Sequence, residues 1–143
     1  MKRRIRLWPN GPRRWVRDPS EDVSRVRALI RRADDTYAAL WSSPGGFTDK
    51  SMRPIADLYR VAADAAEETG FTSWARDLRG QARRFMVVDW ARQRWPWAEI
   101  LPTDIHALTA TRGGEVNRFL IGSSWEVRMD RRGRVRIMRG ATR

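Results

Sequence analysis

The stretch "WEVRMDRRGRVRIMRG", from Trp125 to Gly140, alternates apolar residues with charged ones around a turn-like "DRRG". Alternation at every second residue predicts a half-buried β-strand on each side of the turn. Aspartate in the first turn position and glycine in the fourth suit a type I turn whose glycine is left-handed. We therefore expect a β-hairpin that closes over Asp130–Gly133.

This turn fixes a register for the two predicted strands. Counted outward from the turn, Met129 should pair with Val135, Arg128 with Arg136 and Val127 with Ile137. Residues opposite each other in an antiparallel pair lie on the same face of the sheet. One face then carries Trp125, Val127, Met129, Val135 and Ile137, and the other carries Glu126, Arg128, Arg134, Arg136 and Met138. We expect the first face to pack and the second to be exposed and cationic.

Three segments before the hairpin have helical periodicity. The first begins at Ser20, a predicted N-cap, and ends at "SSPGG" (Ser42–Gly46). The second runs from about Ser51 to Thr69, with Gly70 as its C-terminal cap. The third begins with Thr72 as its cap and ends near Trp95, because Pro96 cannot continue a helix.

The remaining segments are less regular. Thr103 is a possible cap for a short helix through about Thr111, and a second short helix is predicted over Gly114–Ile121, with a strand as the open alternative. At the other end, "RRIRLWPNGPRRWVRD" has two strand-like pieces around "PNGP", which suit a strand, a hairpin or a flexible arm.

Together these patterns predict a mainly α member of the α+β class. A three-helix core should be followed by short helices and a C-terminal β-hairpin, with an N-terminal strand or hairpin as an alternative to an arm. We divide the chain into a basic N-terminal segment (1–18), a helical core (19–111) and a basic C-terminal segment (112–143), packed as one domain.

The charge is distributed unevenly. Net charge is +12, and residues 1–17, 18–111 and 112–143 carry +7, −1 and +6. Codon bias can explain why arginine is used in place of lysine, but it does not explain why carboxylates avoid both ends. The asymmetry predicts a surface that faces a polyanion, provided that the fold brings the two ends together.

We therefore expect a small, non-enzymatic nucleic-acid-binding protein, with duplex DNA favoured over RNA. Phosphate contacts should come from arginines of both ends, and Asn117 and Arg118 should reach base edges. The predicted nucleic-acid-binding residues are Arg3, Arg4, Arg6, Arg13, Arg14, Asn117, Arg118, Arg128, Arg131, Arg132, Arg134 and Arg136.

The order of helices, short helix and basic hairpin resembles the layout of a winged-helix module. This resemblance implies that "GGEVNRFLIGSS" is the recognition element and that "DRRGR" is a wing that meets phosphate. It is a resemblance of order only, because "IHALTATRGGEV" lacks a clear helix-turn-helix pattern and the three long helices are additional.

Several chemistries have no support in the sequence. The absence of cysteine excludes thiolate metal sites and disulfides, and His106 is the only histidine, so we predict no metal site, no cofactor and no catalytic residues. The longest apolar runs are too short to span a membrane and no signal-peptide core precedes them, so we expect a cytoplasmic protein without membrane contact.

An adapter that docks an acidic protein, of the phage or mobile-element type, is the alternative function. Trp95 and Trp97 around Pro96 suit an exposed aromatic ridge on such a protein, although closure of the core is the favoured interpretation of this motif. Trp41, Trp74 and Trp125 lie on predicted buried stripes. A homodimer is possible, but no pattern indicates one.

Overall fold

The computed structural model describes residues 4–6, 15–17, 19–43, 50–108 and 116–140. Its elements are β1 (Arg4–Arg6), β2 (Trp15–Arg17), α1 (Pro19–Trp41), α2 (Arg53–Glu68), α3 (Thr72–Arg94), a 3-10 turn η1 (Pro102–Asp104), β3 (Ile105–Ala107), β4 (Arg118–Ile121), β5 (Trp125–Met129) and β6 (Val135–Gly140). This confirms a mainly α fold of the α+β class.

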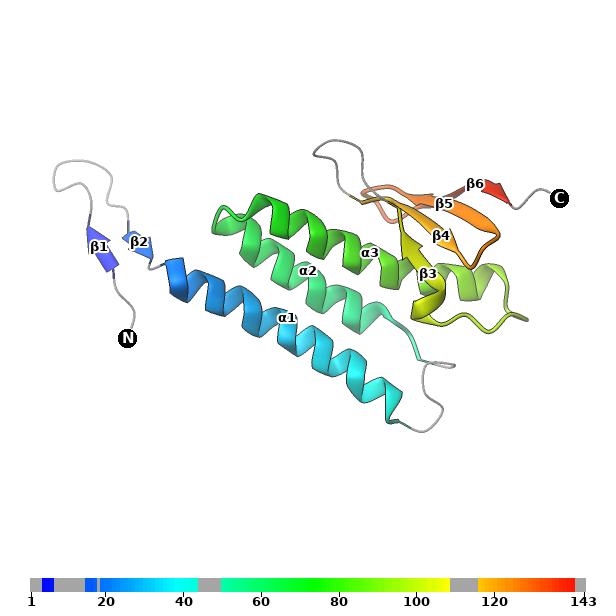
Figure 1. The fold of residues 1–143 in the computed structure, drawn as a ribbon, viewed down its shortest axis with the longest axis horizontal. Helices are drawn as coiled ribbons and strands as arrows, with labels where there is room; N and C mark the ends of the chain where they lie inside the picture. Colours follow the sequence, from blue (N-terminus) through cyan, green and yellow to red (C-terminus); the bar gives the residue numbers. More distant parts are fainter. Residues whose placement is uncertain (1–3, 7–14, 18, 44–49, 109–115, 141–143) are drawn as a thin grey trace.

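The three helices lie side by side, with α2 between α1 and α3 (Figure 1). The antiparallel sheet, in the order β3-β4-β5-β6, lies against α3 on the side away from α1, while β1 and β2 pair only with each other in a two-strand ribbon. Buried residues of the helices and of β3, β4 and β5 form one continuous core. The helical layer therefore supports one face of the sheet and leaves the other open.

The centre of the helical layer is an aromatic cluster with one ring from each helix. The fully buried ring of Phe85 in α3 lies 5.1 Å from the ring of Tyr37 in α1 and 5.7 Å from the ring of Tyr59 in α2. The Tyr59 hydroxyl donates a hydrogen bond to Asp34 of α1. This hydrogen bond links α1 to α2, and burial, followed by the contact with Asp34, raises the pKa of Tyr59.

The helix ends follow local sequence signals, with two differences. Gly70 ends α2 with φ +88°, and its N–H and that of Phe71 donate to the carbonyls of Glu67 and Ala66, as predicted for a glycine cap. Thr72, however, is already the first residue of α3, and Phe71 is the N-cap. Helix α1 likewise begins at Pro19, which places Ser20 inside the first turn and not at the cap.

Neither predicted short helix forms in the described residues. Pro102–Asp104 makes only one 3-10 turn, and Ile105–Ala107 continues as β3, which pairs with β4. Arg118–Ile121 is strand β4, so the strand that was the alternative to a short helix is the structure observed here. Residues 109–115 lie outside the described residues. Strand β4 lies between β3 and β5, and pairing with both provides backbone hydrogen bonds that a four-residue helix lacks.

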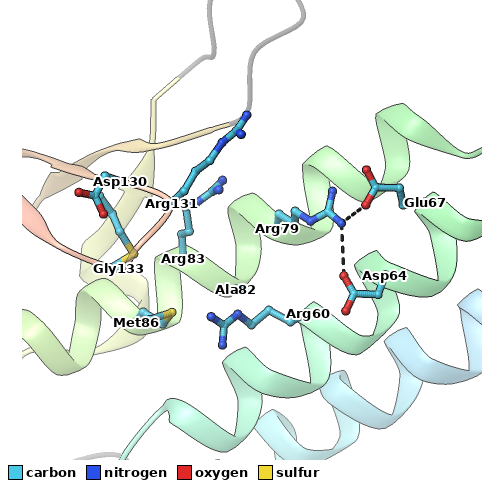
Figure 2. Close-up of a pocket in the computed structure, with 11 residues that line it drawn as sticks. Arg60, Asp64, Glu67, Arg79, Ala82, Arg83, Met86, Asp130, Arg131 and Gly133 are labelled. Atoms are coloured by element: carbon cyan, nitrogen blue, oxygen red, sulfur yellow. Dashed lines mark hydrogen bonds and ion pairs between the residues drawn. The ribbon is translucent and has the colours of Figure 1, made fainter.

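Ion pairs also join α2 to α3. The guanidinium of Arg79 in α3 lies 3.3 Å from the carboxylate of Asp64 and also contacts that of Glu67, both in α2 (Figure 2). The charge of Arg79 is therefore neutralised within the helical layer.

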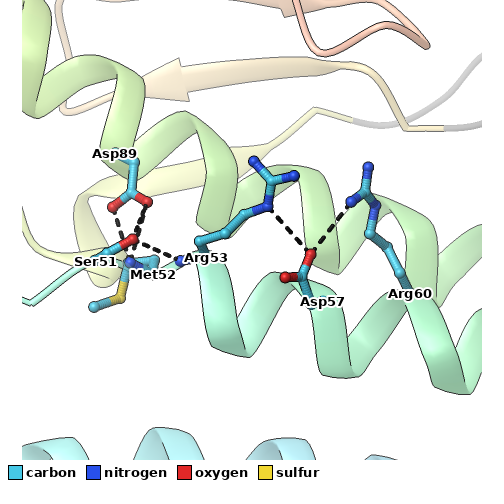
Figure 3. Close-up of polar contacts among 6 residues, drawn as sticks. All are labelled: Ser51, Met52, Arg53, Asp57, Arg60 and Asp89. Atoms are coloured by element: carbon cyan, nitrogen blue, oxygen red, sulfur yellow. Dashed lines mark hydrogen bonds and ion pairs between the residues drawn. The ribbon is translucent and has the colours of Figure 1, made fainter.

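The N-terminus of α2 is capped from another helix. The Asp89 carboxylate of α3 accepts hydrogen bonds from the N–H of Met52 (2.9 Å) and from the Ser51 hydroxyl (2.8 Å), and the Ser51 oxygen accepts from the N–H of Arg53 at 3.1 Å (Figure 3). A carboxylate in this position also interacts favourably with the positive end of the helix dipole.

We expect Asp89→Ala to lower the free energy of unfolding by about 1.5–3 kcal/mol, because it removes charge-assisted hydrogen bonds from a partly buried helix end. Urea unfolding followed by circular dichroism measures this loss. Asp89→Asn is the control, since its amide oxygen still accepts the Met52 N–H and should retain part of the stability. An alanine variant as stable as the original chain would contradict the capping role.

Candidate nucleic-acid interface

Three arginines form a row across the open face of the sheet. Arg118 of β4 is the partner of Arg128 in β5, which is the partner of Arg136 in β6, and all three are exposed. Neighbouring strands are about 4.8 Å apart, so the three arginines start from a row of Cα atoms roughly 10 Å long. The predicted pairing of Arg128 with Arg136 is confirmed, as are those of Met129 with Val135 and Val127 with Ile137.

The next row contains a carboxylate between arginines. Glu126 is opposite Arg139 in β6 and accepts hydrogen bonds from Arg118, while its Oε2 lies 3.0 Å from Nε of Arg139. The hydrogen bond from Arg118 is the main cause of the lowered pKa of Glu126. Glu126 is buried, although we predicted it on the exposed face with the arginines, because the two guanidinium groups cover it.

A bulge in the hairpin explains why Arg139 was missed. The register shifts between Glu126 and Val127, so Glu126 pairs with Arg139 and not with Met138 as strict alternation predicts. The side chain of Arg139 is 80% exposed and that of Arg118 is 49% exposed, so both retain a surface for a ligand after pairing with Glu126. We call Arg118, Arg128, Arg136 and Arg139 the cationic face; with Glu126 among them its net charge is +3.

The hairpin loop presents three more exposed arginines, Arg131, Arg132 and Arg134, which we call the tip. The Asp130 carboxylate accepts from the backbone N–H groups of Arg132 and Arg134, each at 2.9 Å, and these bonds hold the pKa of Asp130 below its usual range. Gly133 has φ +82° and its N–H donates to the Asp130 carbonyl, which confirms the predicted turn. The loop conformation thus depends mainly on the backbone and Asp130; of the three arginine side chains, that of Arg134 also pairs with Asp130, with Nε 3.4 Å from Oδ2.

A groove of about 420 Å³ is lined by residues of α2, of α3 and of the hairpin (Figure 2). Its floor includes Ala82, Met86 and Met129, and its walls carry charges of both signs. Arg131 lines its edge, whereas Arg83 in the wall donates to the carbonyl of Val116. The loop lies against α3 at Gly133, where a Cβ would be 3.4 Å from Cε of Met86, while the arginines of the tip stay exposed to a large ligand.

Arg4 and Arg6 of β1 are not part of this surface. Arg4 and Arg6 lie in β1, opposite Arg17 and Trp15, and Arg3, Arg13 and Arg14 lie outside the described residues. Figure 1 shows β1 and β2 beyond the first residues of α1, at the opposite end of the molecule from β6. The single surface predicted from both ends of the chain is therefore wrong for the described residues, because the length of α1 separates them.

The winged-helix interpretation is also wrong at its recognition element. Arg118 belongs to a strand, and the Asn117 carbonyl accepts the backbone N–H of Met129 at 2.8 Å, so Asn117 is part of the sheet ladder. Asn117 is half-buried. No helix in the described part of this segment is available to enter a groove of DNA.

The tryptophans divide between packing and exposure. Trp95 packs against Trp90 (ring centroids 5.5 Å apart) and Trp125 (5.4 Å), whereas Trp97 is 78% exposed. Trp74 packs against the core, but Trp41 and Trp125 are exposed, unlike our prediction. The "WPW" motif therefore contributes one ring to packing and one to the surface.

Other sites have little structural basis. His106 is exposed in β3, opposite Leu120. Within the described ranges, no group of three or more histidines or carboxylates is placed to hold a metal ion. Among these same residues no helix has the length and apolar character needed to cross a membrane.

By its fold and this surface, the protein is a mainly α domain that presents a cationic antiparallel sheet. Comparisons of the chain with protein-family models, with curated proteins and with solved structures find no match.

Proposed function

We propose that this protein binds nucleic acid, with duplex DNA as the favoured ligand, through the cationic face and the tip. The observation that carries the proposal is the cross-strand row Arg118–Arg128–Arg136, which continues into Arg139 on the same open face. Arginine side chains that start from such a row suit the phosphates of a polyanion, which supply most of the affinity in such complexes. The role assigned is binding, with no catalytic residue.

The composition of the open face favours phosphate contacts over stacking on unpaired bases. The described residues of this face include no phenylalanine, tyrosine or tryptophan, since Phe119 of β4 is buried in the core. Proteins that bind single strands use aromatic rings as platforms for the bases.

We expect affinity for duplex DNA to fall steeply with salt. If about six of the seven arginines of the face and tip neutralise phosphates, the logarithm of the binding constant should fall by about 5.4 per decade of salt. That slope corresponds to about three orders of magnitude between 50 and 200 mM salt. Gel shifts or fluorescence anisotropy across a salt series, with duplex DNA, single-stranded DNA and RNA in parallel, measure it.

Two results of this series would overturn the proposal in different ways. Affinity that does not change with salt would rule out a phosphate-binding face. Tighter binding to single-stranded DNA or RNA would keep nucleic acid as the ligand but replace duplex DNA.

Docking of an acidic protein is the second candidate function. It is favoured by the open edge of β6, which a nucleic acid does not use.

A further inference from the structure

Strand β6 is the exposed edge of the four-strand sheet. The order β3-β4-β5-β6 leaves its outer side without a neighbouring strand among the described residues. The other edge, β3, has three residues, whereas β6 has six. A longer edge offers more backbone groups for pairing with another chain.

The backbone groups of Val135 and Ile137 point to this open side. The N–H of Met129 donates to Asn117, toward β4, and that of Asp130 donates to Arg134, toward β6. Hydrogen-bonded and non-hydrogen-bonded pairs alternate in an antiparallel ladder. Arg128 and Arg136 therefore form a hydrogen-bonded pair, whereas Val135 and Ile137 belong to non-hydrogen-bonded pairs. The N–H and C=O groups of Val135 and Ile137 consequently point away from β5, toward the open side.

The side chains of β6 specify what an added strand should carry. Arg136 and Arg139 stand on the cationic face, and Ile137 on the other face is 37% exposed although it is apolar. Cross-strand neighbours stabilise a sheet when they have opposite charges or when both are apolar. An added strand should therefore alternate acidic residues, next to the arginines, with apolar residues, next to Ile137.

We propose that the β6 edge binds an extended segment of another protein in which acidic and apolar residues alternate, and that this segment adds a fifth strand to the sheet. Main-chain hydrogen bonds to Val135 and Ile137 provide affinity, and Arg136 and Arg139 provide selectivity for acidic side chains. The site shares Arg136 and Arg139 with the cationic face, but unlike the phosphate contacts it also requires the backbone groups of the strand edge.

A second copy of this chain is a poor occupant of the same edge. Antiparallel pairing of two β6 strands would bring Arg136 and Arg139 of one copy next to those of the other. Like charges on neighbouring strands destabilise the pair, and charged edges are a known protection against self-association.

Ile137→Pro tests the proposal, because it removes an N–H that points outward without removing a bond to β5. Proline is tolerated on an edge strand in this orientation. A labelled peptide of alternating glutamate and valine is titrated with protein and followed by fluorescence anisotropy. We expect the proline variant to bind this peptide about tenfold more weakly or worse, and the control Ile137→Ala to stay within roughly threefold of the original chain.

A charge reversal provides a second test that leaves the backbone intact, which matters if the proline variant does not fold. Arg136→Glu should weaken binding of the Glu/Val peptide and favour a Lys/Val peptide of the same length. A scrambled Glu/Val peptide should bind poorly to the original chain, because it cannot place its acidic residues on one face.

The outcomes separate this inference from the proposed function. Equal peptide binding by Ile137→Pro and the original chain would overturn strand addition, and so would equal binding of the scrambled peptide. A concentration-dependent dimer abolished by Ile137→Pro would assign the edge to a second copy instead. Ile137→Pro should bind duplex DNA with unchanged affinity and salt slope, so strand addition can fail without affecting the DNA proposal.

Discussion

Replacement of Arg131, Arg132 and Arg134 together by alanine is expected to lower the affinity for duplex DNA by about two to three orders of magnitude at about 0.1 M salt. The loss of three phosphate contacts should make the salt slope shallower by about 2.7, since each contact contributes about 0.9. Fluorescence anisotropy with a labelled duplex, repeated over the salt series, measures both quantities.

The fold should survive this triple replacement. The Asp130 carboxylate holds the loop through backbone N–H groups, which alanine retains. Among the described residues, the replacement removes one ion pair, the exposed contact between Arg134 and Asp130 at 3.4 Å. Surface pairs of this kind contribute about 0–1 kcal/mol. Thermal unfolding should therefore change little, and a lost transition would show that the arginines are structural.

The matched control is Arg27→Ala, Arg31→Ala and Arg32→Ala in one chain. These arginines are exposed on α1, which α2 and α3 separate from the sheet (Figure 1). The control changes the net charge by the same amount at a different place. If both triple variants lose the same affinity, binding depends on overall charge and the assigned surface is wrong.

Phe85→Ala is expected to lower the free energy of unfolding by about 3–5 kcal/mol. The ring is fully buried and contacts Tyr37 of α1 and Tyr59 of α2, so its removal leaves a cavity where all three helices meet. A domain of ordinary stability has about 5–15 kcal/mol in total, so this variant should unfold at markedly lower urea concentration.

Phe85→Leu is the control for the cavity, because leucine fills most of the volume and should lose much less stability. Urea unfolding monitored at two wavelengths gives the free energies and checks that the unfolding slope is unchanged. A loss below about 1 kcal/mol for Phe85→Ala would show that the three helices do not share one core at this ring.

Features with local causes could be predicted from the sequence. Helices α1, α2 and α3 have long periodic stripes, and Gly70 ends α2 because it accepts a positive φ. The hairpin turn depends on Asp130 and Gly133, which are close in sequence, so its register up to Ile137 was correct.

Features that depend on distant partners could not be predicted in this way. Four residues at Arg118–Ile121 carry too little periodicity to separate a helix from a strand, and pairing with β5 decided the outcome. The bulge that brings Arg139 opposite Glu126 changes the register without any turn residue to indicate it. The burial of Glu126 follows from two arginines on different strands.

The sequence by itself therefore determined the helices, the hairpin turn and the concentration of positive charge at both ends of the chain. Only the tertiary structure decided which charges act together: β4 places Arg118 beside Arg128, and the length of α1 keeps Arg4 and Arg6 of β1 away from the sheet. The physical reason is that capping and turn preferences act over a few residues. Strand pairing and helix packing depend instead on contacts between segments that are distant in the sequence, and these segments take their positions only when the whole core is buried.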